Sequence, residues 1–150
     1  MIERLRESDD KAFGFRVSGM VTAEEVEAFT PQLEQAIQRR GRRPIGILAD
    51  LSALQGVAWG ARWEEIKFLS RWAERIERVA VVGAGPWENV KAQVLAGTVL
   101  VQAETRYYDA SAILHAWHWV KTGDAVGVAG QPILGKDALM KGYVPEYSEV

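Results

Sequence analysis

The sequence predicts an α/β protein in which helices cover a central β-sheet. Two short apolar runs, residues 44–50 and 78–83, are typical of buried strands. Amphipathic segments with the period of a helix follow both runs. Because strands alternate with helices after an initial hairpin, we expect a sandwich with a mostly parallel central sheet of about five strands and about four helices.

The chain is predicted to begin with a β-hairpin. Residues 2–7 alternate weakly between apolar and polar side chains, and residues 9–11 favour a turn. Residues 12–17 alternate more clearly, which predicts a strand with one apolar face. That face consists of Phe13, Phe15 and Val17.

A capping box marks the start of the first helix. The Thr22 hydroxyl can accept a hydrogen bond from the backbone N–H of Glu25, and the Glu25 side chain can reach back to Thr22. Pro31 lies inside the helical pattern, so we expect a kink or a restart there, with Thr30 as the new N-cap. The apolar stripe of this helix consists of Val26, Phe29, Leu33, Ala36 and Ile37.

Gly41 is expected to end the first helix, and arginines lie on both sides of it. Such a cluster can bind an anion or a phosphate. Cations at the C-terminus of a helix also complement its dipole, and the acidic balance of the whole chain favours this second interpretation. The arginines are Arg39, Arg40, Arg42 and Arg43.

Three further helices are predicted over residues 61–77, 86–101 and 110–121, and a final strand over residues 105–108. Each helix has one apolar face, which we expect to pack on the sheet. These faces consist of Trp63, Ile66, Leu69, Trp72, Ala73 and Ile76 in the first, of Trp87, Val90, Val94 and Leu95 in the second, and of Ile113, Leu114, Trp117 and Val120 in the third.

The composition changes after the last predicted helix. Asp109 caps that helix and Gly123 ends it. Glycine and proline then break any long element, but apolar side chains are too frequent for a disordered tail. We therefore expect one domain over residues 1–123 and an extension over residues 124–150 that packs on the body of the domain or on a partner chain.

Length and composition exclude several classes of protein. The chain has 150 residues, enough for one domain with its own core, and no cysteine, which excludes disulfides and thiolate chemistry. Its net charge of -2 argues against nucleic-acid binding, and no apolar run is long enough to span a membrane. The charged N-terminus lacks the apolar core of a signal peptide, so we expect a cytoplasmic protein.

Several short motifs occur in an order and spacing that match a known family. They are FRVSG at residues 15–19, ILADL at 47–51, WEEIKF at 63–68, RVAVVG at 78–83, WE at 87–88, RYYD at 106–109 and AWHW at 116–119. With these motifs, residues 1 to about 121 resemble the SpoIIAA-like family, a branch of the STAS and CRAL-TRIO superfamily. The resemblance implies a small cytoplasmic, bacterial-type domain that is sometimes dimeric and has no catalytic residues.

The resemblance also bears on regulation by phosphorylation. Phospho-regulated STAS domains carry an acidic residue and then a serine where the central strand leads into its helix. Here Asp50-Leu51-Ser52 fits the start of that pattern, but Ala58 and Trp59 occupy the two positions. The usual acceptor is therefore expected to be absent. Ser52 is expected to form a local turn hydrogen bond, and a role as substitute acceptor is the less favoured alternative.

No residue pattern predicts catalysis, a metal or a cofactor. His115 and His118 lie three residues apart on one helix, but no further ligands have a suitable spacing. Residues 83–86 join a strand to a helix, yet Glu88 stands where the dinucleotide fingerprint needs a further glycine. We therefore do not expect an enzyme.

Tryptophan provides the strongest remaining functional signal. Trp59, Trp63, Trp72 and Trp87 cluster in the strand-loop-helix half of the chain. Burial in the core explains Trp63 and Trp72, whereas Trp59 follows the carboxyl end of a strand, where open α/β sheets bind ligands. Together the four side chains can line an apolar pocket.

Two hypotheses follow from these observations. The first is a non-enzymatic regulatory or protein-interaction module, expected to be a homodimer, whose contact surface includes Ser52, Val57 and Trp59. The alternative is a carrier or sensor of a lipid or another apolar small molecule, bound in the tryptophan-lined pocket.

Overall fold

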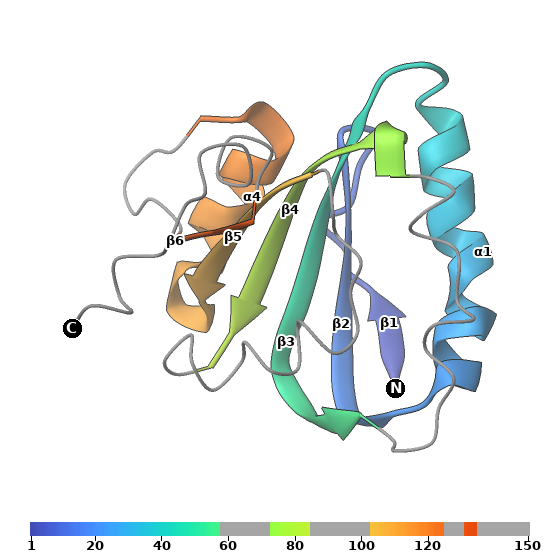
Figure 1. The fold of residues 1–150 in the computed structure, drawn as a ribbon, viewed down its shortest axis with the longest axis vertical. Coiled ribbons are helices and arrows are strands. Elements are labelled where there is room, and N and C mark those ends of the chain that lie inside the picture. The colour runs from blue at the N-terminus through green and yellow to red at the C-terminus, as the bar shows by residue number, and fades with distance from the viewer. Residues whose placement is uncertain (58–72, 85–102, 125–130, 135–150) are drawn as a thin grey trace.

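The computed structural model describes residues 1–57, 73–84, 103–124 and 131–134. Within these residues, six strands form one sheet in the order β1-β2-β3-β4-β5-β6, and two α-helices lie on its opposite faces (Figure 1). The α/β class that the sequence predicts is therefore confirmed. The strands are β1 (Ile2–Arg4), β2 (Ala12–Val21), β3 (Ile45–Val57), β4 (Ile76–Gly83), β5 (Glu104–Asp109) and β6 (Gln131–Leu134).

The sheet is mixed rather than mostly parallel, and it has one more strand than predicted. Strands β2 to β5 run parallel to one another, whereas β1 and β6 pair antiparallel at the two edges. The sequence predicts the hairpin of β1 and β2 but not β6. Because β6 is short and contains Pro132, its pairing with β5, rather than any local pattern, defines it.

Two α-helices, not four, are present in the described residues: α1 (Ala23–Arg39) and α4 (Ile113–Thr122). The helix predicted over residues 86–101, and most of the one over 61–77, lie outside the described residues. The end of the latter prediction is wrong, because Ile76 begins β4, where it pairs with Ile45. Among the described residues, no helix is both long enough and apolar enough to cross a membrane.

Helix α1 is continuous through its proline. The capping box forms as predicted: the Glu25 N–H donates to Thr22 Oγ1 at 3.2 Å, and the Thr22 N–H donates to Glu25 Oε2 at 3.5 Å. The expected restart at Thr30 is wrong, because its hydroxyl donates to the Val26 carbonyl at 2.8 Å inside the helix. Pro31 is exposed, so water can bond the carbonyl that loses its partner.

Two of the arginines after α1 fasten the turn that leads to β3. Arg40 Nε donates to the Pro44 carbonyl at 2.9 Å, and Arg40 Nη1 lies 3.8 Å from the Asp10 carboxylate. Arg43 Nε donates to the Arg40 carbonyl at 3.4 Å. Local hydrogen bonds after the end of the helix thus account for these two side chains.

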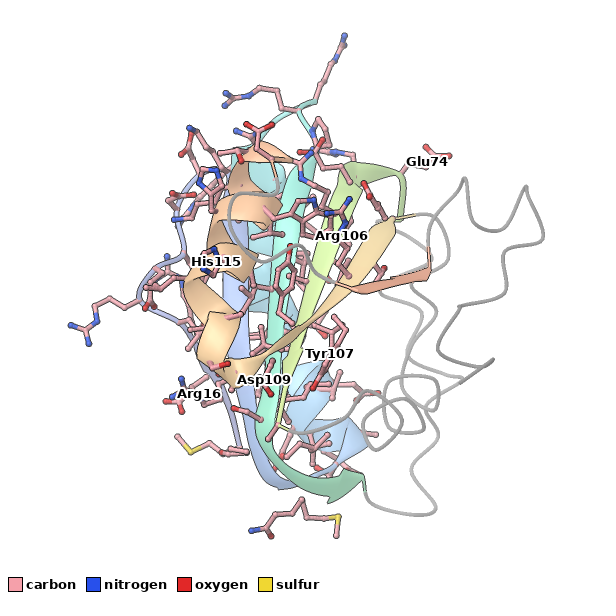
Figure 2. The ribbon with its side chains drawn as sticks, turned by 90° about the vertical axis from the view of Figure 1, so that its left-hand side faces the viewer. Arg16, Glu74, Arg106, Tyr107, Asp109 and His115 are labelled. Atoms are coloured by element: carbon pink, nitrogen blue, oxygen red, sulfur yellow. The ribbon has the colours of Figure 1, made fainter. Side chains whose placement is uncertain are left out.

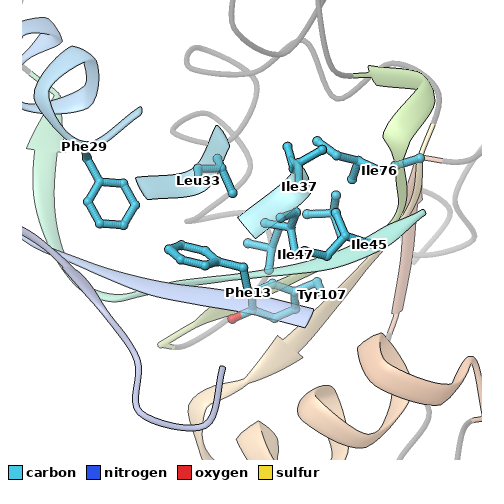
Figure 3. Packing of buried hydrophobic residues seen from close by; sticks show 11 residues of the cluster. Phe13, Phe29, Leu33, Ile37, Ile45, Ile47, Ile76 and Tyr107 are labelled. Carbon is cyan, nitrogen blue, oxygen red and sulfur yellow. The ribbon is translucent and has the colours of Figure 1, made fainter. Parts of the chain in front are cut away.

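Large side chains from both the helix and the strands build the core on the α1 face (Figure 3). The Phe29 ring of α1 lies 5.8 Å from the Phe13 ring and 5.7 Å from the Phe15 ring, both of β2. This cluster of buried residues comprises Phe13, Phe29, Leu33, Ile37, Ile45, Ile47, Ile76, Val79, Val81, Ala103 and Tyr107.

The core on the α4 face combines small strand residues with a bulky helix. A Cβ atom on Gly46 would collide with the Val120 carbonyl oxygen, and a Cβ atom on Gly14 would collide with the Trp117 indole. Glycine at these positions therefore lets α4 approach the sheet closely. The buried cluster comprises Leu5, Ala12, Leu48, Ala80, Val82, Tyr108, Ala112, Ala116, Trp117, Trp119 and Val120.

Helix α4 ends at Gly123 as predicted, but it begins three residues later than predicted and its inward face differs. Gly123 ends it with a φ of 81°. Leu114, expected to face inward, is 74% exposed, whereas Trp119, absent from the predicted stripe, is 1% exposed. A 3₁₀ turn over Ala110–Ala112 precedes the helix. Trp117 and Val120 are buried as predicted, so the buried face of α4 is centred further towards Ala116 and Trp119 than the predicted stripe.

Candidate functional site

A partly buried ion pair lies towards the carboxyl ends of the parallel strands. Arg16 of β2 and Asp50 of β3 are neighbours in the sheet register, and Arg16 Nε donates to Asp50 Oδ2 at 3.0 Å. Both belong to the α4 face, because they share the alternation of Gly14 and Leu48. The Asp50 side chain is 3% exposed and that of Arg16 43%, so the pair links the core to the surface.

Ser52 completes this cluster at an irregularity of β3. Its N–H and its hydroxyl both donate to Asp50 Oδ1, at 3.0 Å and 2.6 Å. The register of β2 and β3 shifts by one residue at this point, where Arg16 pairs with Asp50 but Ser18 pairs with Ala53. The carboxylate thus supplies an acceptor for a backbone N–H where the ladder is interrupted. The local turn bond predicted for Ser52 is confirmed.

Strand β3 continues beyond the point where the sequence predicts a loop. It runs to Val57, and the pairs Met20–Gly56 and Val21–Val57 extend the ladder to the end of β2. The predicted loop after Asp50 is therefore wrong up to Val57. Polar residues and glycine suggested a loop there, but the long strand β2 offers a pairing partner over its whole length.

The tryptophans that the sequence analysis selected lie outside the described residues. They are Trp59, Trp63, Trp72 and Trp87. The other two candidate residues, Ser52 and Val57, both lie in β3 and flank its second register shift. The structure therefore brings Ser52 together with Asp50 and Arg16, and places Val57 at the end of the same strand.

An exposed apolar side chain lies beside this end of β3. Met20 is 56% exposed, although it belongs to β2 and pairs with Gly56. The preceding Gly19 has a φ of 69°, a backbone conformation that glycine adopts readily and that other residues rarely adopt. The carboxyl ends of β2 and β3 thus combine the partly exposed Arg16 and Ser52 with a large apolar side chain.

Strand β5 ends at the same side of the sheet, at Asp109 (Figure 2). Asp109 Oδ2 accepts hydrogen bonds from the N–H of Ser111 at 2.9 Å and from its hydroxyl at 2.6 Å, which caps the 3₁₀ turn.

Burial, and then the negative charge of Asp109, raise the pKa of Tyr107 above its ordinary value, so its phenol stays protonated at neutral pH. Asp109 therefore serves as a cap and Tyr107 as part of the α1-face core.

Neither histidine lies in a metal-binding arrangement within the described part of the chain. His118 is exposed and His115 half-buried on α4. No group of three or more histidine, cysteine, aspartate or glutamate side chains in that part gathers closely enough to hold a metal ion.

Arg16 is the site residue that sequence reasoning missed. A signal for it exists: in the alternating segment 12–17, Arg16 falls on the face opposite Phe13 and Phe15. Asp50 likewise ends an apolar run. Only the adjacency of β2 and β3, a contact between distant parts of the sequence, shows that the two charges meet.

The sheet is mixed and has a helix on each face, and its central strand β3 is interrupted by an Asp-Leu-Ser turn that bonds to itself. These features define a small domain of the α/β sandwich class. Within this class, the chain belongs to the SpoIIAA-like family, whose model matches residues 12–121. The resemblance inferred from the motifs is therefore confirmed.

A solved structure supports the same assignment. The chain is similar to an uncharacterized protein with a SpoIIAA-like fold from Shewanella loihica PV-4, whose crystal structure superimposes with a TM-score of 0.60. The two sequences are 25% identical, and the match covers 80% of this chain and 92% of the other. A comparison with curated proteins finds no match.

Proposed function

We propose that this protein is a non-enzymatic interaction module of the STAS type that acts as a homodimer and lacks the usual phospho-acceptor serine. The membership in the SpoIIAA-like family supports the class. The sequence places Ala58 and Trp59 where the acidic residue and the acceptor serine occur in phospho-regulated relatives.

The bonding of the Asp50 cluster, Arg16, Asp50 and Ser52, supports a role without catalysis. Its serine and carboxylate lie 2.6 Å apart, as in a nucleophile and its base. Here, however, the other oxygen of that carboxylate is paired with Arg16 at 3.0 Å. The oxygen that accepts the hydroxyl also accepts the N–H of Ser52, which makes the contact a local turn.

Met20 is the observation that carries the interaction role. A large apolar side chain that is 56% exposed, within a strand and beside Ser52–Val57, is the kind of group that a partner covers. A second copy of the chain is the partner we propose, since the apolar residues beyond residue 124 need a surface on which to be buried. The self-association surface therefore includes Met20 together with Ser52, Val57 and Trp59.

Sedimentation velocity over a range of protein concentrations tests this proposal. The full chain is expected to sediment as a dimer, and Met20→Asp is expected to weaken the dimer by roughly tenfold or more, because it places a charge in a desolvated contact. Leu114→Asp is the matched control, since Leu114 is also an exposed apolar residue but lies on α4. A monomeric wild type, or equal effects of the two variants, contradicts the proposal.

A second candidate function rests on the four tryptophans Trp59, Trp63, Trp72 and Trp87. In this alternative they line a pocket that carries or senses a lipid or another apolar small molecule. Native mass spectrometry of freshly purified protein distinguishes the two functions. A mass excess that disappears on denaturation supports the carrier, whereas a bare dimer supports the interaction module.

A further inference from the structure

We propose that Arg16, held in place by Asp50, forms a binding site for an oxyanion, namely a carboxylate or a phosphate group. The site lies within β2 and β3 but level with the carboxyl ends of β4 and β5, since Asp50 pairs with Val82 near the end of β4. In open α/β sheets, ligands bind at the carboxyl ends of strands. The site adjoins the proposed self-association surface at Ser52, but its binding of an oxyanion does not depend on the dimer.

The way in which Arg16 is bonded leaves its outer edge available. Only Nε donates to Asp50, at 3.0 Å. The two terminal nitrogens have no hydrogen-bond partner among the described residues, and the side chain is 43% exposed. A guanidinium has five N–H groups in a fixed plane, so fixing Nε also orients the two terminal groups. These groups can donate two parallel hydrogen bonds to one oxyanion.

Asp50 is suited to orient the arginine rather than to compete for the ligand. Its carboxylate is almost completely buried, and its two oxygens together accept hydrogen bonds from Arg16 and from the N–H and hydroxyl of Ser52. A buried carboxylate with these donors holds the guanidinium in one rotamer. An exposed arginine loses side-chain entropy when it binds a ligand. Because Arg16 is already held in place, this cost is smaller, which favours affinity.

The arginine cluster after α1 provides an internal comparison. Arg43 is also an arginine whose Nε is hydrogen-bonded, in its case to the Arg40 carbonyl at 3.4 Å. That contact is long, lies at the surface and involves no buried charge. Arg43 therefore shares the charge of Arg16 but not its fixed orientation, and it serves as the control for nonspecific attraction of anions.

NMR titration of the full-length protein tests the site. The reporters are the Nε–H signal of Arg16 and the backbone N–H signal of Ser52, followed as sodium phosphate or sodium acetate replaces sodium chloride at constant ionic strength. We expect both signals to shift and to saturate. The phosphate and acetate titrations show which of the two oxyanions binds more tightly.

Two variants distinguish bidentate recognition from charge alone. Arg16→Lys keeps the positive charge beside Asp50 but removes the planar fork, so we expect binding at least roughly tenfold weaker, followed at the Ser52 N–H. Arg43→Gln is expected to bind as the wild type does. Because Arg16→Lys retains a cation for the buried carboxylate, it is expected to stay folded, which the amide spectrum itself reports.

Several results would overturn the oxyanion site. One is a shift that grows linearly with phosphate and acetate without saturating, as nonspecific screening does. Another is equal affinity in Arg16→Lys and the wild type, or a similar loss in Arg43→Gln. Self-association is measured separately by sedimentation, so a monomeric protein that still binds phosphate contradicts only the proposed dimer, and a dimer without saturable binding contradicts only this site.

Discussion

The two faces of the sheet are packed in opposite ways. On the α1 face, strands and helix both contribute large side chains, and the phenylalanines of β2 meet Phe29 of α1. On the α4 face, glycine and alanine of the strands lie beneath the tryptophans of the helix. The α1 face is mainly apolar, with the buried Thr105 as an exception, whereas the α4 face carries the charged pair Arg16–Asp50.

This difference indicates a division of roles within one domain. A face that is packed with bulky strand residues has no space for charged groups and serves stability. A face that receives its bulk from the helix leaves the strands free to carry small and charged residues, including those of the Asp50 cluster. The three predictions below test that division, and they run from the largest expected effect to the smallest.

The first prediction concerns removal of bulk from the α1 face. Phe13 is 3% exposed and contacts the ring of Phe29, so Phe13→Ala is expected to cost about 4 kcal/mol of unfolding free energy. Urea denaturation followed by circular dichroism measures this cost. Phe15→Ala, at a partly buried position on the same strand, is the control and is expected to cost less. Equal costs would mean that Phe13 is not central to this core.

The second prediction concerns addition of bulk to the α4 face. Gly46→Ala places a methyl group against the Val120 backbone, which cannot move without displacing the helix, so we expect a loss of about 3 kcal/mol. Gly41→Ala is the matched control, since no atom lies near its Cβ position, although its φ of 66° disfavours alanine. The same denaturation experiment compares the two. If Gly46→Ala costs no more than Gly41→Ala, close approach of α4 is not what requires this glycine.

The sequence predicts the two faces unequally well. Alternation in residues 12–17 and the stripe of α1 predict the α1-face core correctly, because large apolar side chains give a periodic signal. The capping residues Thr22 and Gly123 are also predicted correctly, whereas Asp109 caps the 3₁₀ turn that precedes α4 rather than α4 itself.

The α4 face is harder to predict, since its signal comes from contacts between distant parts of the sequence. From the sequence alone, Gly46 only weakens the prediction of a strand. Its role, to let α4 approach the sheet, depends on the position of that helix. Trp119 is buried and Leu114 exposed, contrary to expectation, because apolar side chains lie around most of α4 and its periodicity alone does not select the inward face. Arg16 and Asp50 each read as surface charges, and only the pairing of β2 with β3 brings them together.

The last prediction, with the smallest effect, concerns acid sensitivity of the α4 face. Lys121 near the end of α4 donates to Asp9, at 3.0 Å, and its ammonium also lies 5.1 Å from the Trp117 ring centroid. Burial alone would raise the pKa of Asp9, but the hydrogen bonds from Lys121 and from the backbone N–H of Lys11 and Ala12 outweigh it and lower the pKa below 3.8. Stability from this carboxylate is therefore fully present above pH 3.8 and is lost as the pH falls through the lower folded-state pKa.

Urea denaturation at a series of acidic pH values measures this loss. Since the Asp9 side chain is 42% exposed, solvent screening limits the expected contribution to about 0.5 kcal/mol. Asp9→Asn is expected to flatten the acid dependence by that amount, whereas Asp10→Asn, at a carboxylate that is 71% exposed and 3.8 Å from its arginine, is expected to retain it. An unchanged acid slope in Asp9→Asn would show that the contact between α4 and the β1–β2 turn does not depend on this charge. The two faces would then differ in packing alone, and the ionic character of the α4 face would be confined to Arg16 and Asp50.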